Sequence, residues 1–246
     1  MNAIILAAGV ARRLAPLTDK THKCLLTVGD RPLLARMLAA LEAAGVRDAV
    51  IVVGHFAGQI RELAGTRFGR VRIRYVDNPE YTKGSAISLY AAREHLGEPA
   101  LVMDADVLFP REFLRRLIVA PAPSAFLVDR GFADTGEEVK YYTRGDRVIA
   151  LGKKVVAESW EQVGEGVGFF KCGAEAGPEL VRLLERVIAE GGGLNEYEDA
   201  LHLLVQQHHV GWVEVTGLPW TEIDFVEDLR RAREEVFPRV ARLDGE

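Results

Sequence analysis

The sequence predicts an α/β fold built on a mixed, mostly parallel sheet. Two features carry this prediction: short apolar runs of strand length alternate with helical patterns up to about residue 106, and a less regular mixture of strands and helices follows. Strands that alternate with helices pair in parallel through right-handed crossovers. The chain has no internal repeat, and its one Pro-rich stretch, residues 121–124, is too short for a linker, so we expect one domain.

The first half of the chain contains the clearest elements. Residues 3–7 form an apolar run that ends before Gly9, which is typical of a strand buried on both faces. In residues 31–45, Pro32 lies near the first turn of a predicted helix, apolar residues recur on one face, and Gly45 ends it. Further strands are predicted at residues 49–54, 71–76 and 100–106, and further helices at residues 58–65 and 84–97.

The second half is less regular. Residues 138–154 are predicted to form a β-hairpin that turns at Arg144, Gly145 and Asp146. Apolar runs at residues 124–130 and 166–172 predict strands on either side of it. Two helices are expected from Pro178 and from about Glu196, followed by a strand at residues 211–216 and a last helix at residues 226–236.

Composition and charge exclude several classes of protein. The 246 residues carry a net charge of −5, with a pI near 5.8, which argues against a general nucleic-acid-binding surface. No apolar run is long enough to span a bilayer, and Met1 and Asn2 lead directly into a strand, so we predict neither a membrane span nor a signal peptide. Cys24 and Cys172 lack metal-ligand spacing and are expected to be reduced, buried thiols. A cytoplasmic protein is the resulting expectation.

The stretch LAAGVARRLAPLT, residues 6–18, follows the first predicted strand and is not explained by burial alone. Ligands of open parallel sheets bind beyond the carboxyl ends of the strands. Gly9 lets a ligand approach the backbone there, and Arg12 and Arg13, with Lys23 downstream, suit a phosphate chain. Neither a Walker motif nor a complete dinucleotide-binding glycine motif is present. On these residues alone, a solvated arginine pair is an equally good interpretation.

Carboxylates form a second group of candidates. Asp104 and Asp106 lie at the carboxyl end of the predicted strand, and they would share a face if that strand continued. Such a pair suits Mg²⁺ bound together with phosphate oxygens; alternatively, Asp104 caps the following turn. Glu222 and Asp224 precede the last helix, where ordinary helix-start chemistry is the alternative, although Asp228 and its neighbours already supply the first turn and leave Asp224 free.

Residues 6–18, with HKCLLTVG at 22–29 and RPLL at 31–34, resemble the opening motifs of the nucleotidyltransferase family that includes the hexose-1-phosphate nucleotidyltransferases. The resemblance covers essentially the whole chain, and its first motif is highly specific. Two positions depart from the family: Ala11 stands where a second glycine is usual, and His22 replaces a proline. The resemblance implies a single Rossmann-like three-layer α/β/α domain over residues 1–246, with a small β-hairpin on the acceptor side.

The resemblance also assigns roles to matching residues. It implies that the nucleotide's base and ribose are surrounded by the residues Leu6, Ala7, Ala8, Gly9, Gly84 and Ser85. It implies that Arg13, Lys23 and Asp106 are catalytic: Arg13 and Lys23 bind phosphates of the nucleotide, and Asp106 joins Asp224 in holding Mg²⁺. The acceptor's phosphate oxygen then attacks the α-phosphorus in line, and pyrophosphate leaves.

The later part of the chain resembles the CTP-dependent members of this family. The stretches at residues 78–93, 137–154, 164–171 and 217–229 are similar to those of enzymes that activate phosphocholine, inositol phosphate or a phosphonate. This resemblance implies transfer of CMP from CTP to such a phosphorylated alcohol. The alternative is a hexose-1-phosphate nucleotidyltransferase that uses UTP, dTTP or GTP. We expect these small molecules as partners, no nucleic acid, and leave a homodimer open.

Candidate contacts to the acceptor lie on and near the predicted hairpin. Lys140 and Lys153 could bind the acceptor's phosphate, or could be solvated hairpin lysines. Glu165, Glu196 and Glu198 could bind an amine or sugar hydroxyls, although carboxylates near helix starts commonly just solvate the first turn. Four aromatic residues could hold a quaternary ammonium or could simply pack: Tyr141, Tyr142, Trp160 and Trp220. Two other protein classes, a nucleotide sensor without turnover and a glycosyltransferase with a D-x-D motif, fit the opening motif and the retained Lys23 less well.

Overall fold

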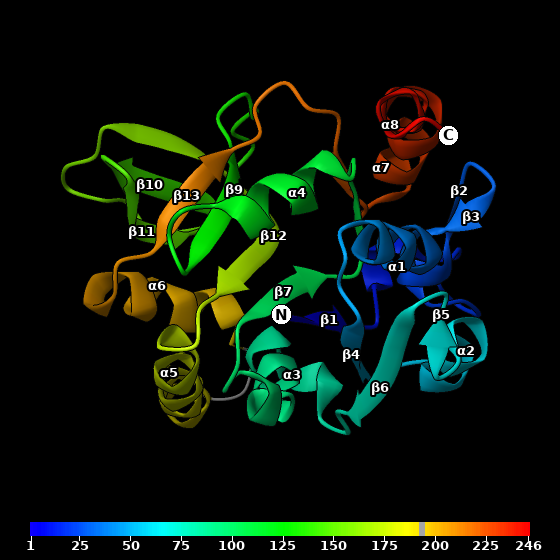
Figure 1. Ribbon diagram of the computed structural model, residues 1–246, viewed down its shortest axis with the longest axis horizontal. Helices are drawn as coiled ribbons and strands as arrows, with labels where there is room; N and C mark the ends of the chain where they lie inside the picture. Colours follow the sequence, from blue (N-terminus) through cyan, green and yellow to red (C-terminus); the bar gives the residue numbers. More distant parts are fainter. Residues whose placement is uncertain (192–194) are drawn as a thin grey trace.

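The computed structural model describes residues 1–191 and 195–246. A ten-stranded sheet runs through it in the order β10-β11-β13-β9-β12-β7-β1-β4-β6-β5 (Figure 1). Its strands are β1 (Asn2–Ala7), β4 (Asp48–Val53), β5 (Arg67–Phe68), β6 (Val71–Asp77), β7 (Ala100–Asp104), β9 (Ala125–Asp129), β10 (Lys140–Arg144), β11 (Arg147–Gly152), β12 (Gln162–Cys172) and β13 (Gly211–Glu214). Two small sheets pair β2 (Thr27–Val28) with β3 (Arg31–Pro32) and β8 (Val107–Leu108) with β14 (Thr221–Glu222).

The helices connect these strands. The α-helices are α1 (Leu33–Ala43), α2 (Ala57–Ala64), α3 (Ser85–Ala91), α4 (Glu112–Val119), α5 (Ala176–Glu190), α6 (Tyr197–Gln207), α7 (Val226–Arg231) and α8 (Phe237–Asp244). Shorter 3₁₀ turns are η1 (Arg12–Leu14), η2 (Lys23–Leu25), η3 (Tyr81–Lys83) and η4 (Arg93–His95), and η5 (Ala232–Val236) is a π-helical turn. The mixed α/β fold class predicted from the sequence is confirmed.

The sheet has two halves of different character. Strands β7, β1, β4 and β6 are parallel neighbours; the apolar runs of β7, β1 and β4 are buried on both faces, whereas β6 alternates, with Val71 and Ile73 buried and Arg72 and Arg74 exposed. Beyond β7 the long strand β12 runs antiparallel to both β7 and β9. The predicted hairpin is β10 with β11; because β10 also pairs with β12, the strands β10, β11, β13, β9 and β12 close a ring of pairings. The hairpin is therefore part of the main sheet.

Helices cover both faces of the sheet and produce three layers (Figure 1). On one face, α1, α2 and α4 bury residues such as Leu38, Ile60 and Phe113 against the sheet. On the other face, α3, α5 and α6 contribute residues such as Leu89 and Leu184 to a second core. Burial of apolar area on both faces stabilises this arrangement. The two cysteines, Cys24 and Cys172, are buried and free as predicted.

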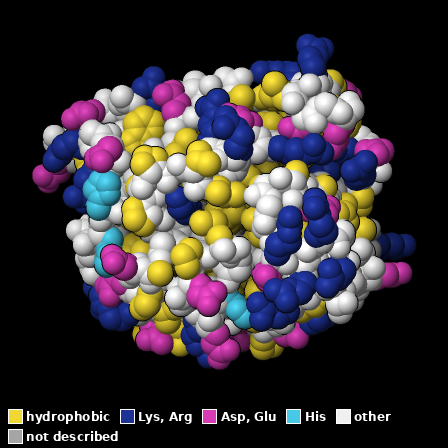
Figure 2. All heavy atoms as spheres, in the orientation of Figure 1, with side chains coloured by type: hydrophobic (Ala, Val, Ile, Leu, Met, Phe, Trp, Pro, Cys, Tyr) yellow, Lys and Arg dark blue, Asp and Glu magenta, His cyan; other side chains and the backbone are white. Residues whose placement is uncertain are grey.

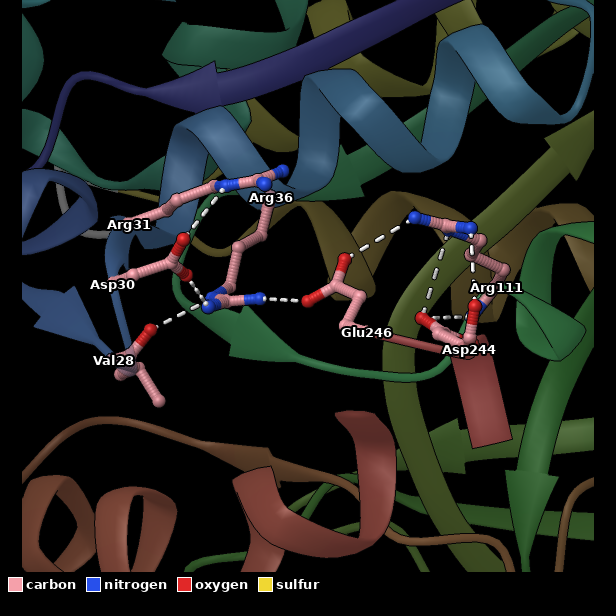
Figure 3. Close-up of polar contacts among 7 residues, drawn as sticks. All are labelled: Val28, Asp30, Arg31, Arg36, Arg111, Asp244 and Glu246. Atoms are coloured by element: carbon pink, nitrogen blue, oxygen red, sulfur yellow. Dashed lines mark hydrogen bonds and ion pairs between the residues drawn. The ribbon is translucent and has the colours of Figure 1, made fainter. Parts of the chain in front are cut away.

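A third, smaller core attaches the C-terminal helices to the loops after β1. Leu14 and Leu26 pack there against Ile223, Leu229 and Val240. Polar contacts hold the same region from outside, as Figure 3 shows: Arg36 pairs with Asp30 and Glu246, and Arg111 pairs with Asp244 and Glu246. The C-terminal helices thus support the two loops that contain Arg13 and Lys23.

Several elements differ from the sequence prediction; for example, the helix predicted at residues 84–97 ends at Ala91, and the strand predicted at residues 166–172 already begins at Gln162. The strand predicted at residues 100–106 ends at Asp104, because the chain turns before β8 begins at Val107. The helix predicted at residues 226–236 continues through η5 and α8 to Asp244. Helix α4 was not predicted, although Phe113, Leu114 and Leu117 form its buried face. Within the described residues, no helix combines the length and the apolar character that crossing a membrane requires.

Basic side chains gather on one face over α1, β5 and β6 (Figure 2). Several of them are paired with acidic side chains: Arg70 with Glu42, Arg72 with Asp48, and Arg61 with Asp77. These ion pairs partly neutralise the basic face. Charged side chains along a sheet edge also oppose pairing with another strand.

Candidate active site

A two-stranded sheet joins residues that lie far apart in the sequence. In the pairing of β14 with β8, Glu222 is opposite Val107, and the Ile223 N–H donates to the Asp106 carbonyl at 3.1 Å. Asp106 comes directly before β8, and Asp224 follows β14. The pairing therefore fixes Glu222 and Asp224 beside Asp106 at the carboxyl end of β7.

Lys23 lies at the centre of these carboxylates. Its ammonium forms ion pairs with Asp106 and, at 3.1 Å, with Asp224 Oδ1. Lys23 is the first residue of the 3₁₀ turn η2, which His22 caps. Burial alone would lower the pKa of Lys23, but the surrounding carboxylates overcome this effect and raise the pKa above its ordinary value. Lys23 therefore stays charged at any physiological pH.

The same carboxylates form a group that fits a hard cation. Asp106, Glu222 and Asp224 each offer an oxygen, and these oxygens lie within 4.8 Å of one another. Asp106 Oδ1 is buried and has no hydrogen-bond partner among the described residues. Burial, together with Asp106 and Asp224, raises the pKa of Glu222, whose tip still reaches solvent. Carboxylate oxygens with uncompensated charge are suitable ligands for Mg²⁺.

The start of α7 leaves Asp224 available, as the sequence predicts. The Asp228 carboxylate accepts hydrogen bonds from the backbone N–H groups of Asp224 and Phe225, at 3.2 and 2.9 Å. This contact closes the helix N-terminus as in a capping box. The Asp224 side chain is therefore not needed for capping and can turn to Lys23.

Asp104 is separated from this group. Because β7 ends at Asp104, the alternation that would place it beside Asp106 does not continue. Its Oδ2 accepts a hydrogen bond from the Tyr197 hydroxyl at 2.7 Å, and it approaches Gly168, where a side chain would collide with it. Burial and the charge of Asp106 raise the pKa of Asp104. Asp104 thus contacts α6 and β12; neither the predicted pairing nor a cap on the next turn is formed.

The loop after β1 leaves part of its backbone open. Leu6 and Ala7 pair within the sheet, and the Ala8 carbonyl accepts from the His55 N–H at 3.1 Å. A Cβ added at Gly9 would meet no protein atom within 4 Å, and its φ is not positive. The protein itself therefore does not require glycine there; a ligand lying against the backbone would.

Ala11 takes the backbone conformation that favours glycine, with φ 52°. Its carbonyl accepts hydrogen bonds from Thr18 Oγ1 at 2.9 Å and from the Leu14 N–H at 3.2 Å. The loop therefore keeps a tight turn despite the missing second glycine. The cost of this conformation for a residue with a Cβ is about 1 kcal/mol.

Arg13 is exposed and is held by two side chains. Its guanidinium lies 5.3 Å from the centre of the Phe225 ring and 3.4 Å from Glu137 Oε2. The same Glu137 oxygen is 3.9 Å from Lys153 Nζ. Two predicted phosphate-binding cations therefore share one carboxylate, in the place where an anionic ligand would be attracted.

Gly84 and Ser85 pack against the start of α6. Gly84 has φ 100°, and a Cβ there would collide with the Asn195 carbonyl. The Ser85 hydroxyl and N–H both donate to Glu196, and the Tyr197 N–H donates to the Ser85 hydroxyl at 2.9 Å. The polar groups of Ser85 are thus occupied within the protein in this structure.

The acceptor-side candidates differ in how they are paired. Lys140 forms an ion pair with Asp134 at 2.6 Å. Glu165 lies opposite Lys140 in the β10–β12 pairing and opposite Asp129 in the β12–β9 pairing, yet its carboxylate has no ion pair within the described ranges. Burial and the charges of Glu138 and Asp129 raise the pKa of Glu165 to about 7.

Glu198 resembles Glu165 in its surroundings. Burial and the charges of Glu196 and Glu222 raise the pKa of Glu198 to about 8, although Lys153 opposes this. Carboxyl groups without a matching number of cations therefore extend from the metal-binding group to Glu198 and Glu165, and their raised pKa values keep these two groups partly protonated near neutral pH. Such a surface attracts a cationic group.

The aromatic candidates pack rather than enclose a ligand. Tyr141 is buried against Phe126, and Tyr142 contacts Trp160 edge to face with ring centres 5.8 Å apart. Trp220 donates through Nε1 to Asp129 at 2.8 Å. The four rings do not form a shared cage among the residues that the structure describes.

Sequence reasoning missed one acidic residue at this site, Glu137, and left two others, Glu222 and Glu198, between alternatives. Glu222 was a candidate together with Asp224, with helix-start chemistry as the alternative, and its two-residue spacing from Asp224 across β14 was the signal for a shared side. Glu137 gave no signal, because its contacts with Arg13 and Lys153 join distant segments. Glu198 was considered, but its burial at the start of α6 follows only from the fold.

Comparison with known proteins agrees with this geometry. Residues 3–161 match the MobA-like NTP transferase domain. The choline-phosphate cytidylyltransferase of Streptococcus pneumoniae is 30% identical over 95% of this chain and 97% of its own length. The CMP-5'-(3-aminopropyl)phosphonate synthase of Streptomyces rubellomurinus is 30% identical over 94% of this chain, and the bifunctional IPC transferase and DIPP synthase of Rubrobacter xylanophilus is 32% identical over 96% of it. The chain spans only 38% and 52% of the lengths of these last two relatives.

Solved structures show the same fold. The CTP:phosphocholine cytidylyltransferase of Streptococcus pneumoniae aligns with a TM-score of 0.75 and 25% identity over 95% of this chain and 97% of that chain. A UDP-glucose pyrophosphorylase aligns with a TM-score of 0.79 at 15% identity, over 96% of this chain and 98% of that chain. Because enzymes for different nucleotides share the fold equally well, the fold does not select the base. The match over most of its length establishes that the chain belongs to the MobA-like NTP transferase domain family, and the relatives similar to it include cytidylyltransferases.

Proposed function

We propose that residues 1–246 form one domain that transfers CMP from CTP to a small molecule carrying a phosphate or phosphonate, with Mg²⁺ as cofactor and pyrophosphate as the second product. The observation that carries this proposal is the meeting of Lys23 with Asp106 and Asp224 beside the open backbone of Gly9. The cytidylyltransferases among the relatives support CTP as donor.

The residues of the site act mainly by position and charge. Asp106 and Asp224, with Glu222, would hold Mg²⁺, which when bound neutralises charge on the phosphate oxygens. Lys23, kept charged by its carboxylate neighbours, binds a phosphate at the reacting centre, and Arg13 binds the triphosphate. The attacking oxygen belongs to the acceptor, so the protein need supply no nucleophile.

Arg13 exchanges its ion pair with Glu137 for one with the substrate's phosphates when substrate binds, and Lys153 shares the same Glu137. Glu137 contacts both cations, and a phosphate chain carries more negative charge than one carboxylate. Phosphate oxygens therefore displace Glu137 from Arg13. Lys153 is then free to bind the acceptor's phosphate, which is one of the two interpretations that the sequence leaves open for this lysine.

The acceptor carries an amine or another cationic group beside its phosphate or phosphonate. Glu165 and Glu198 are half-buried carboxylates with raised pKa values, and a bound cation would stabilise their charged forms. A neutral polyol such as inositol phosphate supplies no such charge. The packed aromatic rings favour a hydrogen-bonding amine over a quaternary ammonium held by rings.

A matrix assay tests this function. Purified protein is combined with each of the four NTPs and with phosphocholine, 2-aminoethylphosphonate, inositol phosphate or glucose 1-phosphate, and pyrophosphate release is measured. We expect release with CTP and an amine-bearing acceptor, and a preference for CTP over UTP of at least about a hundredfold in kcat/KM, because a buried acceptor facing the uracil carbonyl stays unpaired. Equal use of UTP, or release only with glucose 1-phosphate, would assign the chain to the hexose-1-phosphate branch.

A further inference from the structure

His22 stands at the position where the family has a proline, and it is buried near the loop after β1 that contains Gly9 and Ala11. Only 2% of the residue is exposed. Its backbone N–H donates to Gln59 Oε1 at 3.1 Å, and Gln59 Nε2 donates to the Lys20 carbonyl at 2.7 Å. Helix α2 thus fixes the segment that leads into Lys23. A proline at this position would lack the N–H that makes the first of these bonds.

The ring of His22 has a defined tautomer. Nδ1 accepts a hydrogen bond from the Cys24 backbone N–H at 3.2 Å, which caps the turn η2. Because Nδ1 accepts, the proton of the neutral ring is on Nε2. Burial and the adjacent positive charge of Lys23 lower the pKa of His22 to about 4, so the ring is neutral at physiological pH.

The Nε2–H group is buried and incompletely bonded. Nε2 is buried and has no hydrogen-bond partner among the described residues, and the Gly9 backbone lies close enough to the ring to oppose the lowering of its pKa. A buried donor without a partner is unfavourable, so any movement that improves this contact is favoured. Gly9 belongs to the loop whose backbone is open at this residue and whose next turn contains the left-handed Ala11.

We infer that His22 is a positioning residue for nucleotide binding: its Nε2–H completes a hydrogen bond to the Gly9 carbonyl when the nucleotide draws the loop toward Lys23. This inference rests on the proposed use of the loop by CTP. The rigid, buried ring of His22 would then fix the distance between the backbone at Gly9 and Lys23, the residue that follows His22. Hydrogen bonds at such sites are commonly long before the substrate binds and tighten in the complex.

Two substitutions distinguish the roles of the two ring nitrogens of His22. In H22N the amide oxygen can replace Nδ1 as acceptor for the Cys24 N–H, whereas the Nε2–H is lost. In H22Q the longer side chain can place an amide N–H near the Nε2 position, whereas the contact to Cys24 is weakened. We expect H22N to raise the CTP Kd and KM about tenfold, the effect of one lost hydrogen bond, with the Tm, the kcat and the acceptor KM little changed. H22Q should restore most of the CTP affinity.

A measurement on the wild-type protein needs no variant. The Nε2–H proton of His22 should move downfield in the NMR spectrum on addition of CTP and Mg²⁺, and should not move with the acceptor alone. A purely structural histidine would give equal losses of Tm in both variants and no CTP-dependent shift, and that result would overturn the inference. Wild-type protein that binds no CTP would overturn the proposed function as well, whereas CTP binding with an unaffected H22N would overturn the inference alone.

Discussion

The two halves of the sheet differ in how they present charge. At the carboxyl ends of the parallel strands, the nucleotide side offers open backbone at Gly9 and the cations Arg13 and Lys23. On the antiparallel side, Glu165 and Glu198 are carboxylates with raised pKa values. The comparison shows that the two halves differ in charge: cations lie beside open backbone on one side, and carboxyl groups with raised pKa values lie on the other, as the proposed division between a polyphosphate donor and a cationic acceptor requires.

The largest expected effect comes from the carboxylates where the halves meet. Asp106→Asn should lower kcat by about a hundredfold or more, because a ligand of the metal site and the ion pair with Lys23 are lost together. Chelation of divalent metal with EDTA should abolish turnover. The matched control is Asp146→Asn, which changes an exposed aspartate in the β10–β11 turn and should leave kcat unchanged. Retention of most activity by Asp106→Asn at saturating Mg²⁺ would show that the metal is bound elsewhere.

The same division separates what the sequence could predict from what it could not. The parallel half follows from local signals: apolar runs bounded by Gly9 and Gly45 specify strands and helices, and the predicted elements are found there. Contacts of the antiparallel half join distant segments, such as Glu165 with Asp129 across β12 and β9. No local pattern contains that information. The two-residue spacing of Glu222 and Asp224 was visible, but their approach to Asp106 depends on the β14–β8 pairing.

The next prediction, with a smaller expected effect, tests whether the open backbone at Gly9 binds the nucleotide. Gly9→Ala should raise the CTP KM about tenfold or more while the Tm stays constant, because the added methyl meets no protein atom and would meet only a ligand. Gly97→Ala is the matched control, since a Cβ there also meets nothing within 4 Å, and it should change neither quantity. Steady-state kinetics and thermal unfolding measure both. If Gly9→Ala left CTP use intact, the nucleotide would have to lie elsewhere.

A smaller effect concerns charge on the acceptor side. The folded-state pKa of Glu165, about 7, lies above its ordinary value of 4.5, so the folded protein binds the proton more tightly than the unfolded chain does. Stability from this group is therefore fully present below about pH 4.5, is largely kept at pH 5, and is lost as pH rises through 7. Glu165→Gln should have the wild-type Tm at pH 5 and a Tm higher by about 2–4 °C at pH 8, the shift that 1 kcal/mol gives in a chain of this size.

The control for this prediction uses the proposed ligand. An amine-bearing phosphonate should raise the wild-type Tm more at pH 8 than at pH 5, because the charged carboxylate then has a cation to pair with. The difference should shrink in Glu165→Gln. A Tm profile identical in the two proteins would mean that Glu165 is well solvated and does not select the acceptor.

The smallest expected effect tests how much strain the nucleotide side tolerates. Ala11 has φ 52°, a left-handed conformation that costs a residue with a Cβ about 1 kcal/mol and a glycine nothing. Glycine also gains freedom in the unfolded chain, which offsets about half of that benefit. Ala11→Gly should therefore stabilise the protein by about 0.5 kcal/mol, or about 1–2 °C in Tm, and leave the CTP KM unchanged, because Thr18 and Leu14 already hold the turn. Ala11→Val should have the opposite sign, since a β-branched side chain is least compatible with positive φ. If Ala11→Gly instead raised the CTP KM, the strained alanine would be needed to keep the loop after β1 ordered for nucleotide binding. Substrate binding would then depend more closely on the conformation of this loop than on the carboxylates of the acceptor side.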